Sequence, residues 1–129
     1  MIRRRFLTAL VALLALAGMR PAWGAAIRRG TGGGAVAAGL FAFPDSAARL
    51  GRAYLASVPD PQRERRRVQR LGRAWQDLGP DALHGALARR VARDFAADRV
   101  VTLDGWLLSR TEARTCAWVA LQEAVASRP

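Results

Sequence analysis

Few residues in this sequence could do chemistry, and they do not form a recognisable catalytic set. After residue 24 the chain has one histidine, His84, one cysteine, Cys116, and no methionine. Haem, iron–sulfur and zinc sites need several clustered ligands. A nucleophile also needs a base within reach, and no Ser–His–Asp, Cys–His or paired-carboxylate arrangement can be assigned. We therefore predict no catalytic residue, no metal site, no cofactor, and a protein that is not an enzyme.

Each candidate has a structural and a functional interpretation. His84 lies beside the apolar positions of a predicted helix, which favours a partly exposed structural histidine over a general base. Cys116 lies on an apolar helix face, so we expect a buried structural thiol; a nucleophile or an intermolecular disulfide is the alternative. A weak surface ion-pair cluster is expected at Arg110, Glu112 and Arg114. A ligand-binding role for Arg114 is the less favoured alternative.

The glycine-rich segment 30–34 resembles a nucleotide-binding loop only superficially. No strand precedes it and no Lys-Ser/Thr pair follows it, so neither the P-loop nor the dinucleotide pattern is met. Its composition is that of a flexible linker. We therefore assign residues 25–42, which are rich in Ala and Gly, to a flexible tether.

Residues 1–24 have the three parts of an export signal: a basic start, an apolar run over 6–17, and a small-residue site before Ala25. The apolar run is too short to span a bilayer comfortably. The start resembles the twin-arginine consensus R-R-x-F-L. We predict recognition by the twin-arginine translocation machinery, cleavage before Ala25 and a periplasmic location; an ordinary secretory signal and an uncleaved anchor are alternatives. The residues that carry this resemblance are Arg3, Arg4, Phe6 and Leu7.

Residues 43–129 are predicted to form one small domain that is mainly helical. Apolar residues at three- and four-residue spacing predict helices over about 44–58, 61–78 and 81–95. The second begins with Asp60 as the cap and Pro61 in the first turn. Asp81 is the expected cap of the third.

The second predicted helix carries the clearest candidate binding surface. Four arginines, three and four residues apart, share one face of it. A solvated face is the simplest interpretation. Binding to an acidic protein or to anionic lipid head groups is the alternative, whereas nucleic acid is not expected for an exported protein. The arginines are Arg63, Arg66, Arg70 and Arg73.

A hairpin and a final helix complete the predicted fold. Asp104-Gly105 is a turn signal that pairs residues 99–103 with residues 106–109. Ser109 and Glu112 have the spacing of a capping box, which predicts a helix from about 110 to 127. We expect Trp106 to anchor the hairpin; if its side chain is fully enclosed, its removal should cost about 3–5 kcal/mol. The predicted fold class is a mainly α, four-helix domain with one β-hairpin before the last helix.

The string W-x-L-S-R-T-E-A-R-x-C-A in residues 106–117 resembles a motif of small uncharacterised bacterial proteins that carry twin-arginine signals. A fainter similarity lies in residues 50–59. The resemblance implies no activity, and no catalytic or binding residue is carried over from it.

Two functions remain as hypotheses. The twin-arginine route carries folded cargo, commonly because a cofactor or a partner travels with it. The first hypothesis is therefore an exported, non-catalytic accessory or small subunit that escorts or docks a larger periplasmic enzyme containing a cofactor. In signal and size the chain is similar to the small subunits of membrane-associated flavin dehydrogenases. The alternative is an independent periplasmic module that binds anionic membranes or acidic partners through its basic helix. After residue 24, 17 arginines against 10 acids leave a net charge of +7, which supports electrostatic docking.

Overall fold

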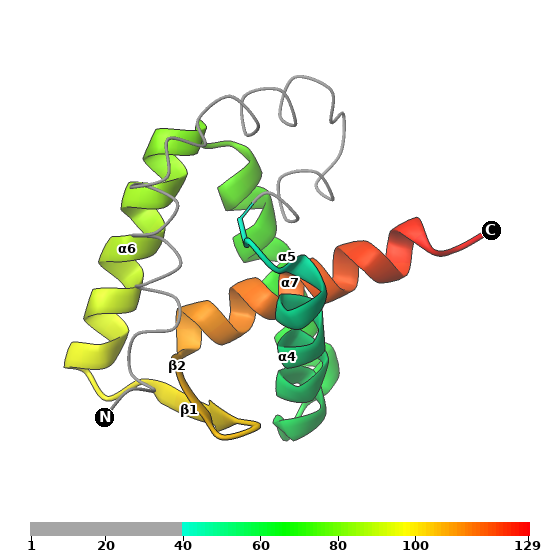
Figure 1. Cartoon of the computed structure of the whole chain (residues 1–129), viewed down its shortest axis with the longest axis horizontal. Coiled ribbons are helices and arrows are strands. Elements are labelled where there is room, and N and C mark those ends of the chain that lie inside the picture. Colours follow the sequence, from blue (N-terminus) through cyan, green and yellow to red (C-terminus); the bar gives the residue numbers. More distant parts are fainter. Residues whose placement is uncertain (1–39) are drawn as a thin grey trace.

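The computed structural model describes residues 40–129, and the predicted export signal lies outside the described residues. The described part contains four helices and a two-stranded antiparallel sheet (Figure 1). This confirms the predicted fold class. In chain order the elements are α4 (Pro44–Ser57), α5 (Pro61–Gln76), α6 (Pro80–Ala96), β1 (Val100–Leu103), β2 (Trp106–Ser109) and α7 (Arg110–Ala126).

Proline occupies the first turn of each of the first three helices, where its missing N–H costs nothing. At α5 the Asp60 carboxylate accepts a hydrogen bond from the Arg63 backbone N–H at 3.0 Å, as predicted. The prediction that Asp81 caps α6 was wrong. Gly79 is the residue before the helix, and Asp81 lies inside the first turn, where its charge interacts favourably with the helix dipole.

The hairpin has the predicted turn and register. Asp104 and Gly105 both have positive φ, at 49° and 79°, as a tight two-residue turn requires. Leu103 pairs with Trp106, and the pairing continues to Val100 and Ser109. β1 begins one residue later than predicted, although the Arg110 N–H still donates to the Arg99 carbonyl at 2.9 Å.

Trp106 is not the enclosed anchor that the sequence suggested. It is half-buried, whereas Leu103 and Leu108 of the same hairpin are buried. Trp106 follows the turn directly and so lies at the end of the hairpin that is far from α7. Leu108 precedes α7 and is fully enclosed by the core.

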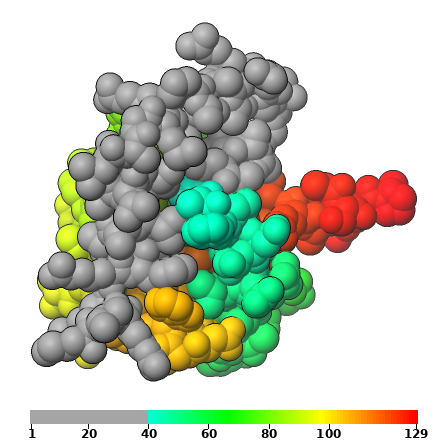
Figure 2. Space-filling view, in the orientation of Figure 1, coloured from blue at the N-terminus to red at the C-terminus, as the bar shows by residue number. Residues whose placement is uncertain are grey.

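The first half of α7 is the centre of the fold. We predicted a single apolar face on this helix, but Thr111–Ala120 is buried nearly all round, with only Arg114 partly exposed. Trp118 is among the most buried side chains, at 1% exposure. The helix packs most extensively against α4 and also contacts α5, α6 and both strands. Its C-terminal end projects from the molecule (Figures 1 and 2).

Two glycines allow the helices to approach α7 closely. A Cβ placed on Gly51 of α4 would lie 2.1 Å from the Cys116 carbonyl oxygen. One placed on Gly72 of α5 would lie 2.2 Å from Nε1 of Trp118. Both distances are well inside van der Waals contact, so any larger residue at these two positions must displace a neighbour.

The core begins before α4. Leu40 and Phe41, which we had placed at the end of the flexible tether, are buried with the core residues, whereas Phe43 is 65% exposed. The core therefore includes two apolar side chains that precede the first turn of α4. Among the described residues, no helix combines the length and apolar character needed to cross a membrane.

Candidate functional site

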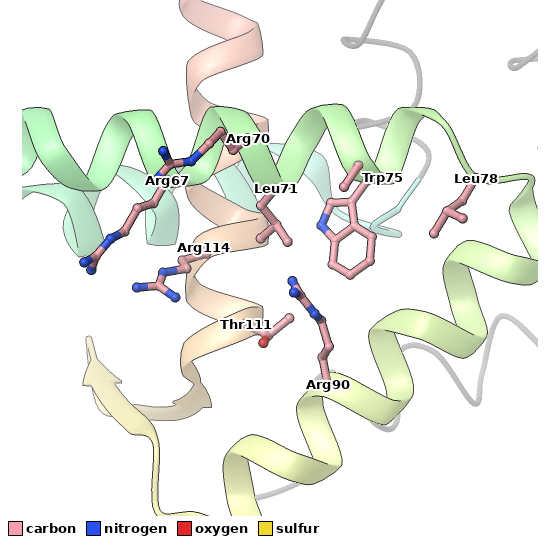
Figure 3. Close-up of a pocket in the computed structure, with 9 residues that line it drawn as sticks. Arg67, Arg70, Leu71, Trp75, Leu78, Arg90, Thr111 and Arg114 are labelled. Carbon is pink, nitrogen blue, oxygen red and sulfur yellow. The ribbon is translucent and has the colours of Figure 1, made fainter.

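A pocket of about 500 Å³ lies where α5, α6 and α7 meet (Figure 3). Its wall combines guanidinium groups with apolar side chains. Five of the lining residues come from α5, one from the connection to α6, one from α6 and two from α7. The lining residues are Arg67, Arg70, Leu71, Ala74, Trp75, Leu78, Arg90, Thr111 and Arg114.

The periodicity of α5 divides its residues between the core and the pocket. Val68 and Gly72 are buried, with Gly72 against Trp118 of α7, and Trp75 follows on the same face. Arg67, Leu71 and the adjacent arginine and alanine positions flank this face and are left at the pocket wall. One helix therefore supplies both the packing contacts and most of the site.

Trp75 combines burial with an unused hydrogen-bond donor. The residue is only 3% exposed, and its indole Nε1–H has no acceptor among the described residues. A buried donor without a partner costs about 1–3 kcal/mol. The Arg90 guanidinium lies over the ring, with Cζ 5.4 Å from the ring centroid, which is a cation–π arrangement. In Figure 3 the indole nitrogen is on the edge of the ring that faces Leu71.

The buried carboxylate of Glu64 holds two of the pocket's arginines, Arg67 and Arg114. Glu64 is 6% exposed and accepts hydrogen bonds from the Tyr54 hydroxyl at 2.7 Å and from Nε of Arg114. Arg67 lies 3.5 Å from its second oxygen. This cluster joins α4, α5 and α7, which are brought together only in the folded chain.

The Glu64 cluster has a defined charge state. Burial would raise the pKa of Glu64, but the hydrogen bonds from Arg114 and Tyr54 outweigh it and hold that pKa below its usual value. Burial, together with the hydrogen bond to Glu64, raises the pKa of Tyr54 to about 12. At neutral pH Glu64 is therefore ionised and Tyr54 is protonated.

A second carboxylate fixes the start of α7 at the pocket. Asp94 of α6 accepts a hydrogen bond from the Thr111 backbone N–H at 2.7 Å and one from Nε of Arg99 at 3.0 Å. Burial works against ionisation, but these hydrogen bonds hold the pKa of Asp94 below its usual value. Asp94 thus satisfies a free N–H at a helix N-terminus with a negative charge.

The predicted capping box is present beside it. The Ser109 hydroxyl accepts from the Glu112 N–H at 3.0 Å, and the Glu112 carboxylate accepts from the Ser109 N–H at 2.7 Å. Burial raises the pKa of Glu112, and the nearby Asp94 charge adds to this effect. Asp104, Gly105, Ser109 and Glu112 therefore have the structural roles that their spacing predicted.

The predicted basic face of α5 is exposed along its whole length. None of its four arginines belongs to an ion pair within residues 40–129. Arg70 alone also lines the pocket. The basic face consists of Arg63, Arg66, Arg70 and Arg73.

The predicted export residues Arg3, Arg4, Phe6 and Leu7 lie outside the described residues.

Of the other candidate residues, Arg114 lines the pocket, whereas Cys116 and His84 do not. Cys116 is buried, as expected, and desolvation raises its pKa to about 12, so its thiol is protonated at neutral pH. His84 is half-buried. The predicted surface cluster on α7 was wrong, because Glu112 is buried in the capping box and Arg114 pairs with Glu64 instead. No group of three or more metal-ligating side chains occurs in the part of the chain that the structure describes.

Sequence reasoning missed the contributions of Glu64, Trp75, Arg90 and Thr111 to the site. One signal was available: Glu64 lies four residues before Val68, on the apolar face of α5, so its burial could have been inferred. The position of Arg90 over Trp75 had no such signal, because it depends on the angle between two helices.

The described residues thus form a small helical domain with an arginine-lined pocket beside an exposed basic helix face. Comparison of the chain with family models, curated proteins and solved structures gave no match.

Proposed function

We propose that this chain is an exported, non-catalytic accessory subunit that docks an acidic surface of a larger periplasmic partner through the basic face of α5. The observation that carries the proposal is the exposure of Arg63, Arg66, Arg70 and Arg73 without ion-pair partners among the described residues. Unpaired surface charges of one sign steer association with a surface of the opposite sign.

An acidic protein is a better partner for this face than a lipid surface. The apolar side of α5, with Val68 and Trp75, is buried in the core and cannot insert between lipids. Binding to a membrane would then rest on charge alone, at about 1 kcal/mol per arginine, and would weaken strongly with salt. The predicted twin-arginine signal adds that the partner is a folded, cofactor-containing enzyme that is exported together with this chain.

The test is affinity isolation of the tagged full-length chain from its native envelope, followed by mass spectrometry. We expect a larger protein in stoichiometric amount. The triple variant R63Q/R66Q/R73Q should lose it. The control R49Q/R89Q/R93Q removes the same charge from exposed positions on α4 and α6 and should keep it.

Two results would contradict docking to a protein. Isolation of the chain as a monomer under gentle conditions would show that it has no such partner. Binding of the purified chain to phosphatidylglycerol vesicles at low salt, lost in the R63Q/R66Q/R73Q variant and with no protein retained, would assign the basic face to the membrane instead.

A further inference from the structure

We propose that the pocket between α5, α6 and α7 binds a small organic anion that has an apolar chain or ring. This site goes beyond the proposed docking function, since it is a concave surface that shares only Arg70 with the basic face and to which α6 and α7 also contribute. Its volume of about 500 Å³ lies within the range of pockets for small organic ligands.

The charge of the lining selects an anion. Four arginines line the pocket, and the carboxylate next to them, Glu64, is shared by Arg67 and Arg114. The other nearby carboxylate, Asp94, is paired with Arg99. Three positive charges are therefore unbalanced around a partly enclosed space, where charges are screened less than in bulk water.

The placement of the donors indicates where the anionic group binds. Figure 3 shows the Arg90 and Arg114 side chains on the two sides of Thr111, which lies at the wall between them. Arg90 has no carboxylate partner among the described residues, and guanidinium groups bind carboxylates and phosphates through paired hydrogen bonds. The anionic group is therefore placed beside Thr111, between Arg90 and Arg114, with Arg90 as its principal ligand.

The apolar part of the wall indicates the rest of the ligand. Leu71, Ala74 and Leu78 line the pocket on the α5 side, and Leu78 is 38% exposed. Trp75 adds the indole ring and the N–H that lacks an acceptor within the described residues. A hydrophilic anion such as inorganic phosphate would use the arginines only, whereas an anion with an apolar body would use both halves of the wall.

The test follows the indole N–H resonance of Trp75 by NMR, in the full-length chain labelled with ¹⁵N-tryptophan and assigned with W75F. We expect octanoate and octyl phosphate to shift this resonance in a saturable manner. Acetate should bind much more weakly, because it lacks the apolar body. 1-Octanol, which has the chain without the charge, should also bind much more weakly.

The matched variants are R90Q and R93Q, which remove one exposed arginine each from α6, inside and outside the pocket. R90Q should weaken octanoate binding by about tenfold or more, and R93Q by less than about twofold. Circular dichroism of both variants checks that they are folded.

The proposal is overturned if neither octanoate nor octyl phosphate shifts the Trp75 resonance up to millimolar concentration. Equal binding of octanoate by R90Q and R93Q would also overturn it, as would equal binding of octanoate and 1-octanol. R90Q leaves Arg63, Arg66 and Arg73 unchanged, so loss of anion binding in R90Q with the larger protein retained separates this site from the docking face.

Discussion

The buried carboxylate of Glu64 is the residue on which both the stability of the fold and the arrangement of the pocket depend. It balances the charge of Arg114, whose side chain is 26% exposed, and it holds Arg67 at the pocket wall. Removing one partner of a buried ion pair is costly because the remaining charge stays in a poorly solvated position. The Tyr54 hydroxyl would also lose the acceptor to which it now donates.

We expect Glu64→Gln to lower the free energy of unfolding by about 2–3 kcal/mol, because it leaves Arg114 without a counter-charge. Urea unfolding followed by circular dichroism measures the change. The control is Glu123→Gln, which breaks the exposed Arg52–Glu123 pair and should cost less than about 0.5 kcal/mol. Equal effects of the two substitutions would show that the Glu64 cluster does not stabilise the fold.

At the residue scale, the sequence did not predict which groups the buried carboxylates contact. Glu64 and Arg114 are 50 residues apart in the chain, and Asp94 and Thr111 are 17 apart. Arg114 had two nearby sequence neighbours, Arg110 and Glu112, that suggested a local cluster. Which acid an arginine contacts across such distances depends on the packing of the helices, and no local pattern encodes it.

At the scale of elements, the features that depend on neighbouring residues were predicted well. The turn at Asp104-Gly105, the capping box of Ser109 and Glu112, and the Asp60 cap each rest on contacts within a few residues. The burial of the first half of α7 on nearly all sides was not predicted, because its small residues show no contrast between two faces. The number of elements that surround a helix is a property of the assembled fold.

The close packing of α4 against α7 gives an element-scale prediction. Gly51→Ala should lower the free energy of unfolding by about 1–3 kcal/mol, because the new Cβ meets the Cys116 carbonyl oxygen at 2.1 Å and the backbone must shift. Thermal and urea unfolding measure the loss.

The control for this substitution is another helical glycine. At Gly85 of α6, a Cβ would meet only the flexible end of Arg89, at 3.1 Å. Gly85→Ala should therefore stabilise the protein by about 0.5–1 kcal/mol through helix propensity. If Gly51→Ala stabilised the protein to the same extent, α4 and α7 would not be in the close contact described here.

At the scale of the whole molecule, buried carboxylates tie the elements together around α7. Glu64 joins α5 to α4 and α7, Asp94 joins α6 to α7, and Glu112 links the hairpin to α7. Each carboxylate lies where chain segments meet, and folding shifts the pKa of each. The free energy of unfolding should therefore depend on pH, and the contributions of the three groups to this dependence differ in sign.

The pKa values of Glu64 and Asp94 are lower in the folded chain than their ordinary values of 4.5 and 3.8. The unfolded chain therefore binds more protons in acid, and the stability that these groups supply is lost as the pH falls below about 4.5 and through their folded pKa values. The pKa of Glu112 is raised, so its contribution has the opposite sign: it is present below 4.5 and is lost as the pH rises through its folded pKa.

We expect the wild-type free energy of unfolding to fall between about pH 4.5 and pH 3, because the two lowered carboxylates outweigh Glu112 in this range. Glu64→Gln, which cannot titrate, should show a shallower fall, so that the difference between the variant and the wild type narrows as the pH decreases. Urea unfolding at a series of pH values measures both curves. If the two curves ran parallel down to pH 3, Glu64 would have the same pKa in both states, and the hydrogen bonds from Arg114 and Tyr54 would not stabilise its charge.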